Sequence, residues 1–283
     1  MTLPTNSEWR PPSSQLELHD GLWRVASVSP VSYPEAGNEV CFQVEDGSFW
    51  FRHRMDCIHG VIRQFPPAGE IYDIGGGNGY VAAALQADGL EVVLVEPGVG
   101  ARNALRRGVR HVVQATMEDA HFHLSSLAAA AAFDVIEHIA DDVSFLRGIR
   151  ERLVHGGRFY CTVPASQTLW SDEDIHAGHF RRYTCQTLTQ VLHEAGFTVE
   201  FVSPFFLWLT LPVYLFRALP SQLRRKDKSA VGTAAIVPSD HRLPFLFSGL
   251  IRYAQAWELG RLRARRPLLF GTSLLCVARA NHS

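Results

Sequence analysis

The sequence predicts an α/β fold, a doubly wound and mainly parallel sheet of seven strands with helices on both faces. Between residues 66 and 203, short apolar runs rich in β-branched residues alternate with helical segments. The first of these runs leads directly into a glycine-rich turn. The chain has 283 residues, of which 47% are hydrophobic, and this is enough to bury one large core.

The strands and helices follow one another in a regular order. Strands are expected at residues 70–74, 91–95, 110–114, 127–133, 158–163, 197–202 and 272–278. Helices are expected at residues 47–65, 79–87, 101–107, 141–153 and 184–195. Pro66 and Pro67 end the first helix, and Gly196 ends the last one. Five consecutive alanines within 127–133 favour a helix by intrinsic propensity, but their place in the alternating series predicts a strand.

Four regions are expected along the chain. Residues 1–65 form an irregular arm followed by a helix, and residues 66–203 form the core. Residues 204–266 differ in character, because they are apolar and helical and carry eleven Lys and Arg against three acids. This segment is therefore +8, whereas the remainder of the chain is −9. Residues 267–283 return to the sheet as its last strand, so 204–266 is expected to be an insertion over one end of the core.

Composition excludes several classes of protein. The five cysteines are scattered and form no C-x-x-C pair, which disfavours a zinc ribbon and a disulfide framework. The N-terminus is polar and has no basic start before an apolar run, so no signal peptide is expected. The most apolar stretch, 204–216, is too short for a bilayer and contains Pro212. A cytoplasmic protein is expected, with peripheral membrane contact as an option, and nucleic acid is not expected as a partner.

A glycine-rich turn and a following acid predict a nucleoside site. Asp73-Ile74-Gly75-Gly76-Gly77-Asn78-Gly79 leaves the first core strand and enters a helix, where backbone N–H groups can approach a ligand. Glu96 ends the next strand, 23 residues after Asp73. In doubly wound folds an acid at this place accepts hydrogen bonds from two ribose hydroxyls. The alternative is a plain glycine turn beside an exposed glutamate.

The spacing of the glycines separates two cofactor classes. A dinucleotide pattern that begins at Gly75 places Tyr80 where a third small residue is needed, and a pattern that begins at Gly77 gives only a relaxed match. The spacing D-x-G-x-G-x-G, in contrast, fits without gaps through Asp73, Gly75, Gly77 and Gly79. This spacing resembles the first motif of class I S-adenosylmethionine-dependent methyltransferases.

Further segments extend this resemblance over about residues 47–203 and the last strand. These segments are Phe49–Arg54, Asp134–Ile139, Arg152–Gly157, Thr162–Ala165 and Gly178–Thr184. They are similar to segments of the ubiquinone-biosynthesis O-methyltransferase group and its type 11, 12 and 23 relatives. The resemblance implies a Rossmann-like methyltransferase fold, S-adenosyl-L-methionine as cofactor, and an N-terminal helix that covers it.

The resemblance also implies which residues hold the cofactor. Asp73 and the motif glycines would bind its methionine end, Glu96 its ribose, and Met117 or Glu118 its adenine. The full set of expected cofactor contacts is Arg52, Asp73, Gly75, Gly77, Asn78, Gly79, Glu96, Met117, Glu118 and Phe133. The chain departs from its relatives at Thr116, where they usually carry an aspartate, and at Leu127-Ala128, where they usually have Phe-Asp.

Methyl transfer is an in-line displacement in which the protein mainly supplies position, so no fixed triad is expected. His138, after the fourth core strand, is the expected base, with a packed core histidine as the alternative. His179 is the second catalytic candidate. Substrate contacts are expected from Asp134, Trp170, Arg181 and Tyr183. A divalent ion on Asp134, Glu137 and His138 is an alternative, although the prediction is that no metal is used.

The expected function is O-methylation of a small-molecule or lipid-linked acceptor. N-methylation of a small molecule and a non-catalytic scaffold of the same fold remain alternatives. A nicotinamide-dependent oxidoreductase is disfavoured by Tyr80 and by the lack of a Tyr-x-x-x-Lys pair. Residues 204–266 would form a lid over an apolar substrate or a surface for anionic lipid or an acidic carrier. The other interpretation is an ordinary helical cap that packs on the sheet.

Overall fold

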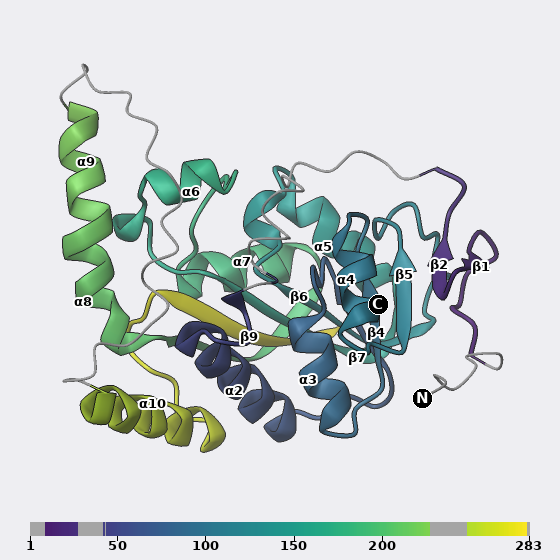
Figure 1. The fold of residues 1–283 in the computed structure, drawn as a ribbon, viewed down its shortest axis with the longest axis horizontal. Coiled ribbons are helices and arrows are strands. Elements are labelled where there is room, and N and C mark those ends of the chain that lie inside the picture. The colour runs from purple at the N-terminus through teal and green to yellow at the C-terminus, as the bar shows by residue number, and fades with distance from the viewer. Residues whose placement is uncertain (1–8, 28–41, 43, 227–247, 282–283) are drawn as a thin grey trace.

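The computed structural model describes residues 9–27, 42, 44–226 and 248–281. Nine strands in this part of the chain form one sheet, in the order β1-β2-β5-β4-β3-β6-β7-β9-β8 (Figure 1). The strands are β1 (Glu17–His19), β2 (Leu22–Arg24), β3 (Ile71–Ile74), β4 (Val92–Val95), β5 (His111–Gln114), β6 (Leu127–Phe133), β7 (Leu153–Pro164), β8 (Phe197–Phe205) and β9 (Ser273–Ala280). All seven predicted strands are present.

The centre of the sheet is parallel, as predicted. β5, β4, β3, β6 and β7 pair in parallel, whereas β9 lies antiparallel between β7 and β8. The alanine run forms strand β6, and Ala129–Ala132 are fully buried. Pairing with β3 on one side and β7 on the other overrides the helical propensity of these alanines.

The N-terminal arm departs from the expected irregular structure. β1 and β2 form a two-stranded hairpin, and β2 pairs in parallel with β5, which adds two strands to the edge of the sheet. Asp20 and Gly21 connect them with φ of 51° and 81°. Two residues of positive φ form the kind of hairpin turn that Asp-Gly favours.

The helices cover the sheet on both faces, and the five that were predicted with bounds fall close to those positions. They are α2 (Phe49–Gln64), α3 (Tyr80–Ala87), α4 (Gly100–Arg106), α5 (Asp142–Arg152), α6 (Asp172–His176), α7 (Cys185–Glu194), α8 (Thr210–Val213), α9 (Leu219–Lys226) and α10 (Ser248–Arg263). One apolar core joins α2, α3, α4 and α10 to the sheet, and a second joins α5 and α7 to it. Two cores on two faces define the doubly wound architecture.

The segment between β8 and β9 is helical. A short 3₁₀ turn at Leu207–Leu209 leads into α8, a π-helical turn at Tyr214–Ala218, and α9, which lie at the left of Figure 1. α10 packs along α2. Among the described residues, none of the helices combines the length and the apolar character needed to cross a bilayer.

A buried carboxylate connects this segment to the core. Glu258 of α10 is 1% exposed and accepts hydrogen bonds from the backbone N–H groups of Phe206 at 2.7 Å and Leu207 at 2.9 Å. Its Oε1 also lies 2.9 Å from Nε2 of His53 on α2. Because a buried carboxylate needs several donors, Glu258 fixes the 3₁₀ turn, α10 and α2 relative to one another.

Candidate active site

A cavity of about 1420 Å³ opens at the carboxyl ends of the parallel strands. Its walls come from the turn after β3, the end of β4, the residues after β5 and β6, the first turns of α2, and the connection before α7. Ligands of doubly wound sheets bind at this edge, where the strand order reverses between β3 and β6.

The turn after β3 is built around glycines with positive φ. Gly75 has φ of 68°, and a Cβ there would lie 2.8 Å from Cγ2 of Val135. Gly79 begins α3 in the left-handed region, and a Cβ there would lie 2.7 Å from Cβ of Ala104. Both positions therefore require glycine on steric grounds. The resulting turn keeps the backbone of residues 75–78 against the cavity.

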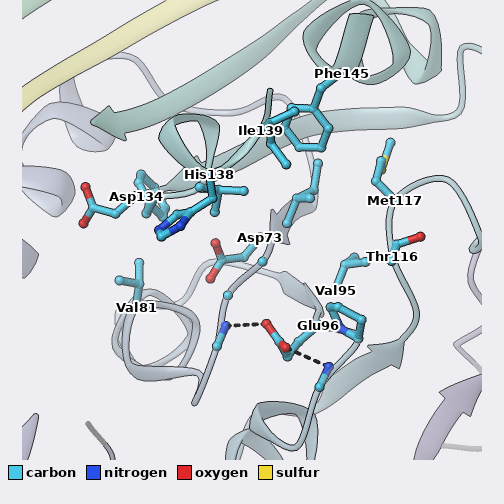
Figure 2. A pocket seen from close by; sticks show the side chains of 18 of the residues that line it. Asp73, Val81, Val95, Glu96, Thr116, Met117, Asp134, His138, Ile139 and Phe145 are labelled. Atoms are coloured by element: carbon cyan, nitrogen blue, oxygen red, sulfur yellow. Dashed lines mark hydrogen bonds between the residues drawn. The ribbon is translucent and has the colours of Figure 1, made fainter. Parts of the chain in front are cut away.

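Glu96 is held at the end of β4 by the backbone of two loops (Figure 2). Its Oε2 accepts a hydrogen bond from Gly77 N–H at 3.1 Å, and its Oε1 accepts one from Gly98 N–H at 2.8 Å. Burial raises the pKa of Glu96, and these two hydrogen bonds oppose the shift. Each carboxylate oxygen has a second lone pair, so Glu96 can still accept hydrogen bonds from a diol in the cavity.

Asp73, at the end of β3, is a buried carboxylate without a hydrogen-bond donor among the described residues. The side chain is 1% exposed, and neither Oδ1 nor Oδ2 has a hydrogen-bond partner. Burial raises the pKa of Asp73 and the nearby Arg54 guanidinium opposes this shift, which leaves the pKa at about 7. A buried acceptor that the protein leaves unsatisfied, at the wall of a cavity, fits a cationic donor from a ligand.

The far wall of the cavity follows β5. Thr116, Met117 and Glu118 line it, and Met117 is 3% exposed (Figure 2). Thr116 Oγ1 accepts a hydrogen bond from the backbone N–H of Asp119 at 3.0 Å. The threonine at the position where relatives usually carry an aspartate therefore caps the following turn.

One face of helix α2 forms part of the cavity wall. Ser48 caps its N-terminus by accepting a hydrogen bond from Trp50 N–H at 3.2 Å. Trp50, Phe51 and Arg54 line the cavity, and the Nη2 atom of Arg54 lies 2.7 Å from Oδ2 of Asp134. Arg52, the residue predicted to bind the cofactor, is exposed and lies outside the cavity lining.

Arg54 is therefore the α2 cation that the structure places at the site. The helical phase explains the difference, since residues 50, 54 and 58 share one face and residue 52 lies on another. Asp134, in turn, is fixed by Arg54 and by Thr162 Oγ1, which donates to its Oδ1 at 3.0 Å.

Two histidines form the wall after β6. The rings of His138 and His179 pack edge to face with centroids 4.7 Å apart, and both residues line the cavity. Burial, and next the neighbouring His179, lower the pKa of His138 to about 4. His138 is thus neutral, and a weak base, at physiological pH.

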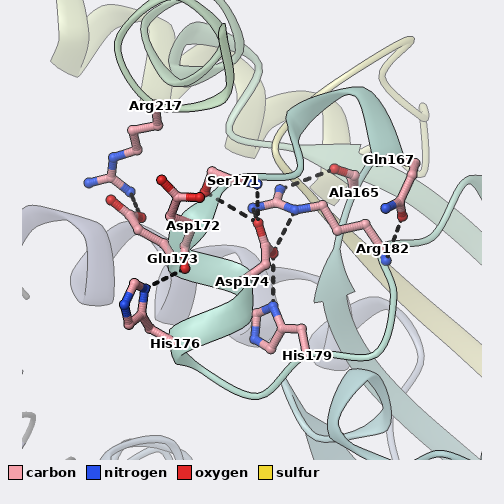
Figure 3. Close-up of polar contacts among 10 residues, drawn as sticks. All are labelled: Ala165, Gln167, Ser171, Asp172, Glu173, Asp174, His176, His179, Arg182 and Arg217. Atoms are coloured by element: carbon pink, nitrogen blue, oxygen red, sulfur yellow. Dashed lines mark hydrogen bonds and ion pairs between the residues drawn. The ribbon is translucent and has the colours of Figure 1, made fainter. Parts of the chain in front are cut away.

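A buried aspartate orients His179 (Figure 3). Asp174 Oδ1 lies 2.9 Å from Nδ1 of His179 and accepts from Nε of Arg182 at 2.7 Å. Its Oδ2 accepts from the Ser171 backbone N–H at 2.8 Å. Burial raises the pKa of Asp174, but the hydrogen bonds from His179 and Arg182 outweigh burial and leave it below its usual value. Asp174 is therefore ionised and holds the His179 ring in place.

Three predicted substrate contacts do not reach the cavity. Arg181 pairs with Asp142 Oδ2 at 2.6 Å, and the buried Tyr183 donates to the same oxygen at 2.7 Å. Trp170 follows a 3₁₀ turn and is also absent from the lining. Asp142 draws Arg181 and Tyr183 toward the start of α5, which explains why they face away from the cavity.

Most of the other predicted residues do meet at the cavity. Its lining includes Asp73, Gly75, Gly77, Asn78, Glu96, Met117, Glu118, Phe133, Asp134, His138 and His179. Gly79 lies just outside it, at the start of α3. Sequence reasoning missed Arg54, Trp50 and Phe180 as lining residues and did not assign a role to Asp174.

A group of possible metal ligands also lies at this wall. Donor atoms of Glu137, His138 and His179 lie within 4.8 Å of one another. Burial, and next the charge of Asp134, raise the pKa of Glu137, and its Oε2 has no partner among the described residues. The group differs from the expected alternative of Asp134, Glu137 and His138, because Asp134 forms an ion pair with Arg54.

Two known bacterial proteins are similar in sequence to this chain. A protein of Mycobacterium tuberculosis, named "Probable S-adenosylmethionine-dependent methyltransferase", is 24% identical over 176 residues, which are 61% of this chain and 64% of that protein. A protein of Mycolicibacterium smegmatis with the same kind of name is 25% identical over 181 residues, which are 60% and 68% of the two chains. The chain thus spans slightly less than two thirds of the M. tuberculosis relative.

Solved structures show the same fold. A Haloferax volcanii methyltransferase, solved in complex with the Trm112 methyltransferase activator, superposes with a TM-score of 0.56 at 18% identity and covers 88% of this chain and 96% of its own. The profile of the methyltransferase domain family matches residues 51–201, which are more than half of the sequence. The chain therefore belongs to the methyltransferase domain family.

Proposed function

We propose that this protein transfers a methyl group from S-adenosyl-L-methionine to a hydroxyl or carboxyl group of a small-molecule or lipid-linked acceptor. The observation that carries the proposal is the pair of buried carboxylates, Asp73 and Glu96, at the ends of adjacent strands on either side of a glycine turn. Both face one cavity, which also contains a histidine oriented by a carboxylate.

The residues present fit the cofactor. Asp73, whose two oxygens lack protein donors, would accept hydrogen bonds from the ammonium group of the methionine end. Glu96 would accept from the ribose hydroxyls, and Met117 would pack beside the adenine. When bound, the cofactor supplies an electrophilic methyl group on a sulfonium. The protein then supplies position and exclusion of water, to which α2 contributes by covering the cavity.

His179 fits the role of general base better than His138 does. His138 has a pKa of about 4, so it has little tendency to take a proton from a hydroxyl at neutral pH. In His179, the Nδ1 edge faces Asp174, which leaves Nε2 on the opposite edge of the ring as the acceptor. An ionised Asp174 would stabilise the imidazolium that forms when His179 takes the acceptor proton. His138 would then pack against His179 and shape the acceptor site.

Two experiments test the proposal. Calorimetric titration should show binding of S-adenosylhomocysteine and none of NAD, and absence of binding to the former at millimolar concentration would remove the proposal. A transfer assay with radiolabelled S-adenosylmethionine and metabolite and lipid extracts, with and without chelator, should then yield a labelled ester or ether. A labelled amine would assign the chain to N-methylation instead, and loss of transfer on chelation would assign a metal to Glu137, His138 and His179.

A further inference from the structure

Exposed apolar side chains concentrate in one part of the molecule. Of the fifteen large hydrophobic side chains that are exposed among the described residues, ten lie between β8 and β9. We call these ten residues the cap surface; they are Leu211, Tyr214, Leu215, Phe216, Leu223, Leu250, Tyr253, Trp257, Leu269 and Phe270. Leu269 is 91% exposed and Phe216 is 79% exposed. Clustering of this kind marks an interaction surface, whereas single exposed residues do not.

Helix α10 shows how the cap surface is built. Its inner face packs on α2, with Glu258 and Leu262 buried. Its outer face carries Leu250, Tyr253 and Trp257, at spacings of three and four residues, so these side chains form one stripe. The helix therefore holds an aromatic and aliphatic stripe away from the core it packs against.

The same elements are basic. Their described side chains include seven arginines, which are Arg217, Arg224, Arg252, Arg261, Arg263, Arg265 and Arg266. Arg217 and Arg224 pair with Glu173 and Asp172 of α6. Within the described parts of 204–272, Glu258 is the one acid, and it is buried. The guanidinium of Arg261 lies 5.6 Å from the Trp257 ring, so a cation and an exposed aromatic ring lie next to each other on this surface.

We propose that the cap surface docks on the headgroup region of an anionic lipid bilayer. Tyr and Trp stripes bordered by arginines suit the membrane–water interface, where rings enter the acyl boundary and guanidinium groups meet phosphates. The docking proposed is peripheral. None of the described helices combines the length and the apolar character needed to cross a bilayer. A symmetric contact between two copies through α10 and the following turn would oppose arginine to arginine, with no exposed acid among the described residues of 248–272, whereas a phosphate-bearing surface complements it.

Vesicle flotation tests this proposal, which goes beyond the proposed function and does not depend on it. Vesicles of phosphatidylcholine alone should not retain the protein, whereas vesicles with equal phosphatidylcholine and phosphatidylglycerol should retain it at low salt and release it at high salt. In the double variant Arg252→Gln/Arg266→Gln the partition coefficient should fall about 30-fold. In Tyr253→Ser/Trp257→Ser it should fall roughly tenfold or more.

Matched controls lie on other parts of the surface. Leu124→Ser removes a side chain that is 69% exposed outside the cap surface, and Arg102→Gln removes an exposed arginine of α4. Both controls should bind vesicles like the parent, and all variants should keep the parent's melting temperature and affinity for S-adenosylhomocysteine. Equal binding to both kinds of vesicle, no binding to the anionic vesicles, or a dimer that the cap variants abolish would overturn the proposal. Failure of the parent protein to bind S-adenosylhomocysteine would count against the proposed function and not against membrane docking.

Discussion

Replacing Glu96 with glutamine tests the cofactor site most directly. A carboxylate that accepts from two ribose hydroxyls makes two charge-assisted hydrogen bonds, each of about 1.5–3 kcal/mol. In the parent protein, the two carboxylate oxygens of Glu96 accept hydrogen bonds from the backbone N–H groups of Gly77 and Gly98. In the variant, the amide keeps one acceptor oxygen, and its NH2 group faces one of these two N–H donors. We expect Glu96→Gln to lose about 2–4 kcal/mol of binding, so Kd for S-adenosylhomocysteine should rise about 30- to 1000-fold.

Calorimetry on Glu96→Gln measures this change, and Glu91→Gln is its control. Glu91 precedes the other end of β4, is exposed, and pairs with Arg110 at 3.1 Å. Its variant should bind within about twofold of the parent, because surface pairs contribute little. Burial already raises the pKa of Glu96, so a neutral amide should be tolerated by the fold. A Kd for Glu96→Gln within about threefold of the parent, with unchanged melting, would refute the assignment of Glu96 to the ribose.

Three other predictions follow from buried carboxylates. Because the pKa of Asp73 is about 7, cofactor affinity should weaken roughly tenfold from pH 8 to pH 6 relative to Asp73→Asn, as calorimetry in both proteins can show. Asp174→Asn and His179→Gln should each lower the methyl-transfer rate about 10²- to 10⁴-fold and alter its pH profile without changing S-adenosylhomocysteine affinity; equal loss of binding would indicate misfolding instead. Glu258→Gln should cost about 2–3 kcal/mol in urea unfolding, whereas the exposed Glu151→Gln should change it by less than about 0.5 kcal/mol.

The parts of the fold that sequence could predict are those set by local pattern. The alternating series predicted β6 in spite of its alanines, since a strand between two others is determined by its partners. The hairpin of β1 and β2 has strands of three residues, too short for a periodic pattern to register. Its turn, Asp20-Gly21, did carry a signal, because Asp-Gly favours the two positive φ values found there.

Some residues of the site could likewise be predicted from the sequence, whereas others could not. Asp73, the motif glycines and Glu96 follow strand ends, and parallel strands bring such ends together, so their meeting could be predicted from spacing. Arg54 and Arg52 lie on different faces of α2, and the face that meets the cavity depends on how the helix packs on the core. The sequence alone does not show that packing. Tyr183 turns away because Asp142, far along the chain, accepts its hydroxyl hydrogen bond. These placements depend on long-range packing.

The positive and the negative charge of the chain lie in different parts of the sequence. The +8 segment at 204–266 contains eight of the ten residues of the cap surface. The −9 remainder contains the cavity carboxylates, an arrangement that suits a sulfonium cofactor in one place and anionic lipid in the other. Trp50 of α2 lines the cavity and stacks on Phe206 at 5.4 Å, and the backbone N–H of Phe206 donates to Glu258 of α10. Membrane docking through the cap surface would therefore be connected to the cavity wall through α10, whose inner face packs on α2.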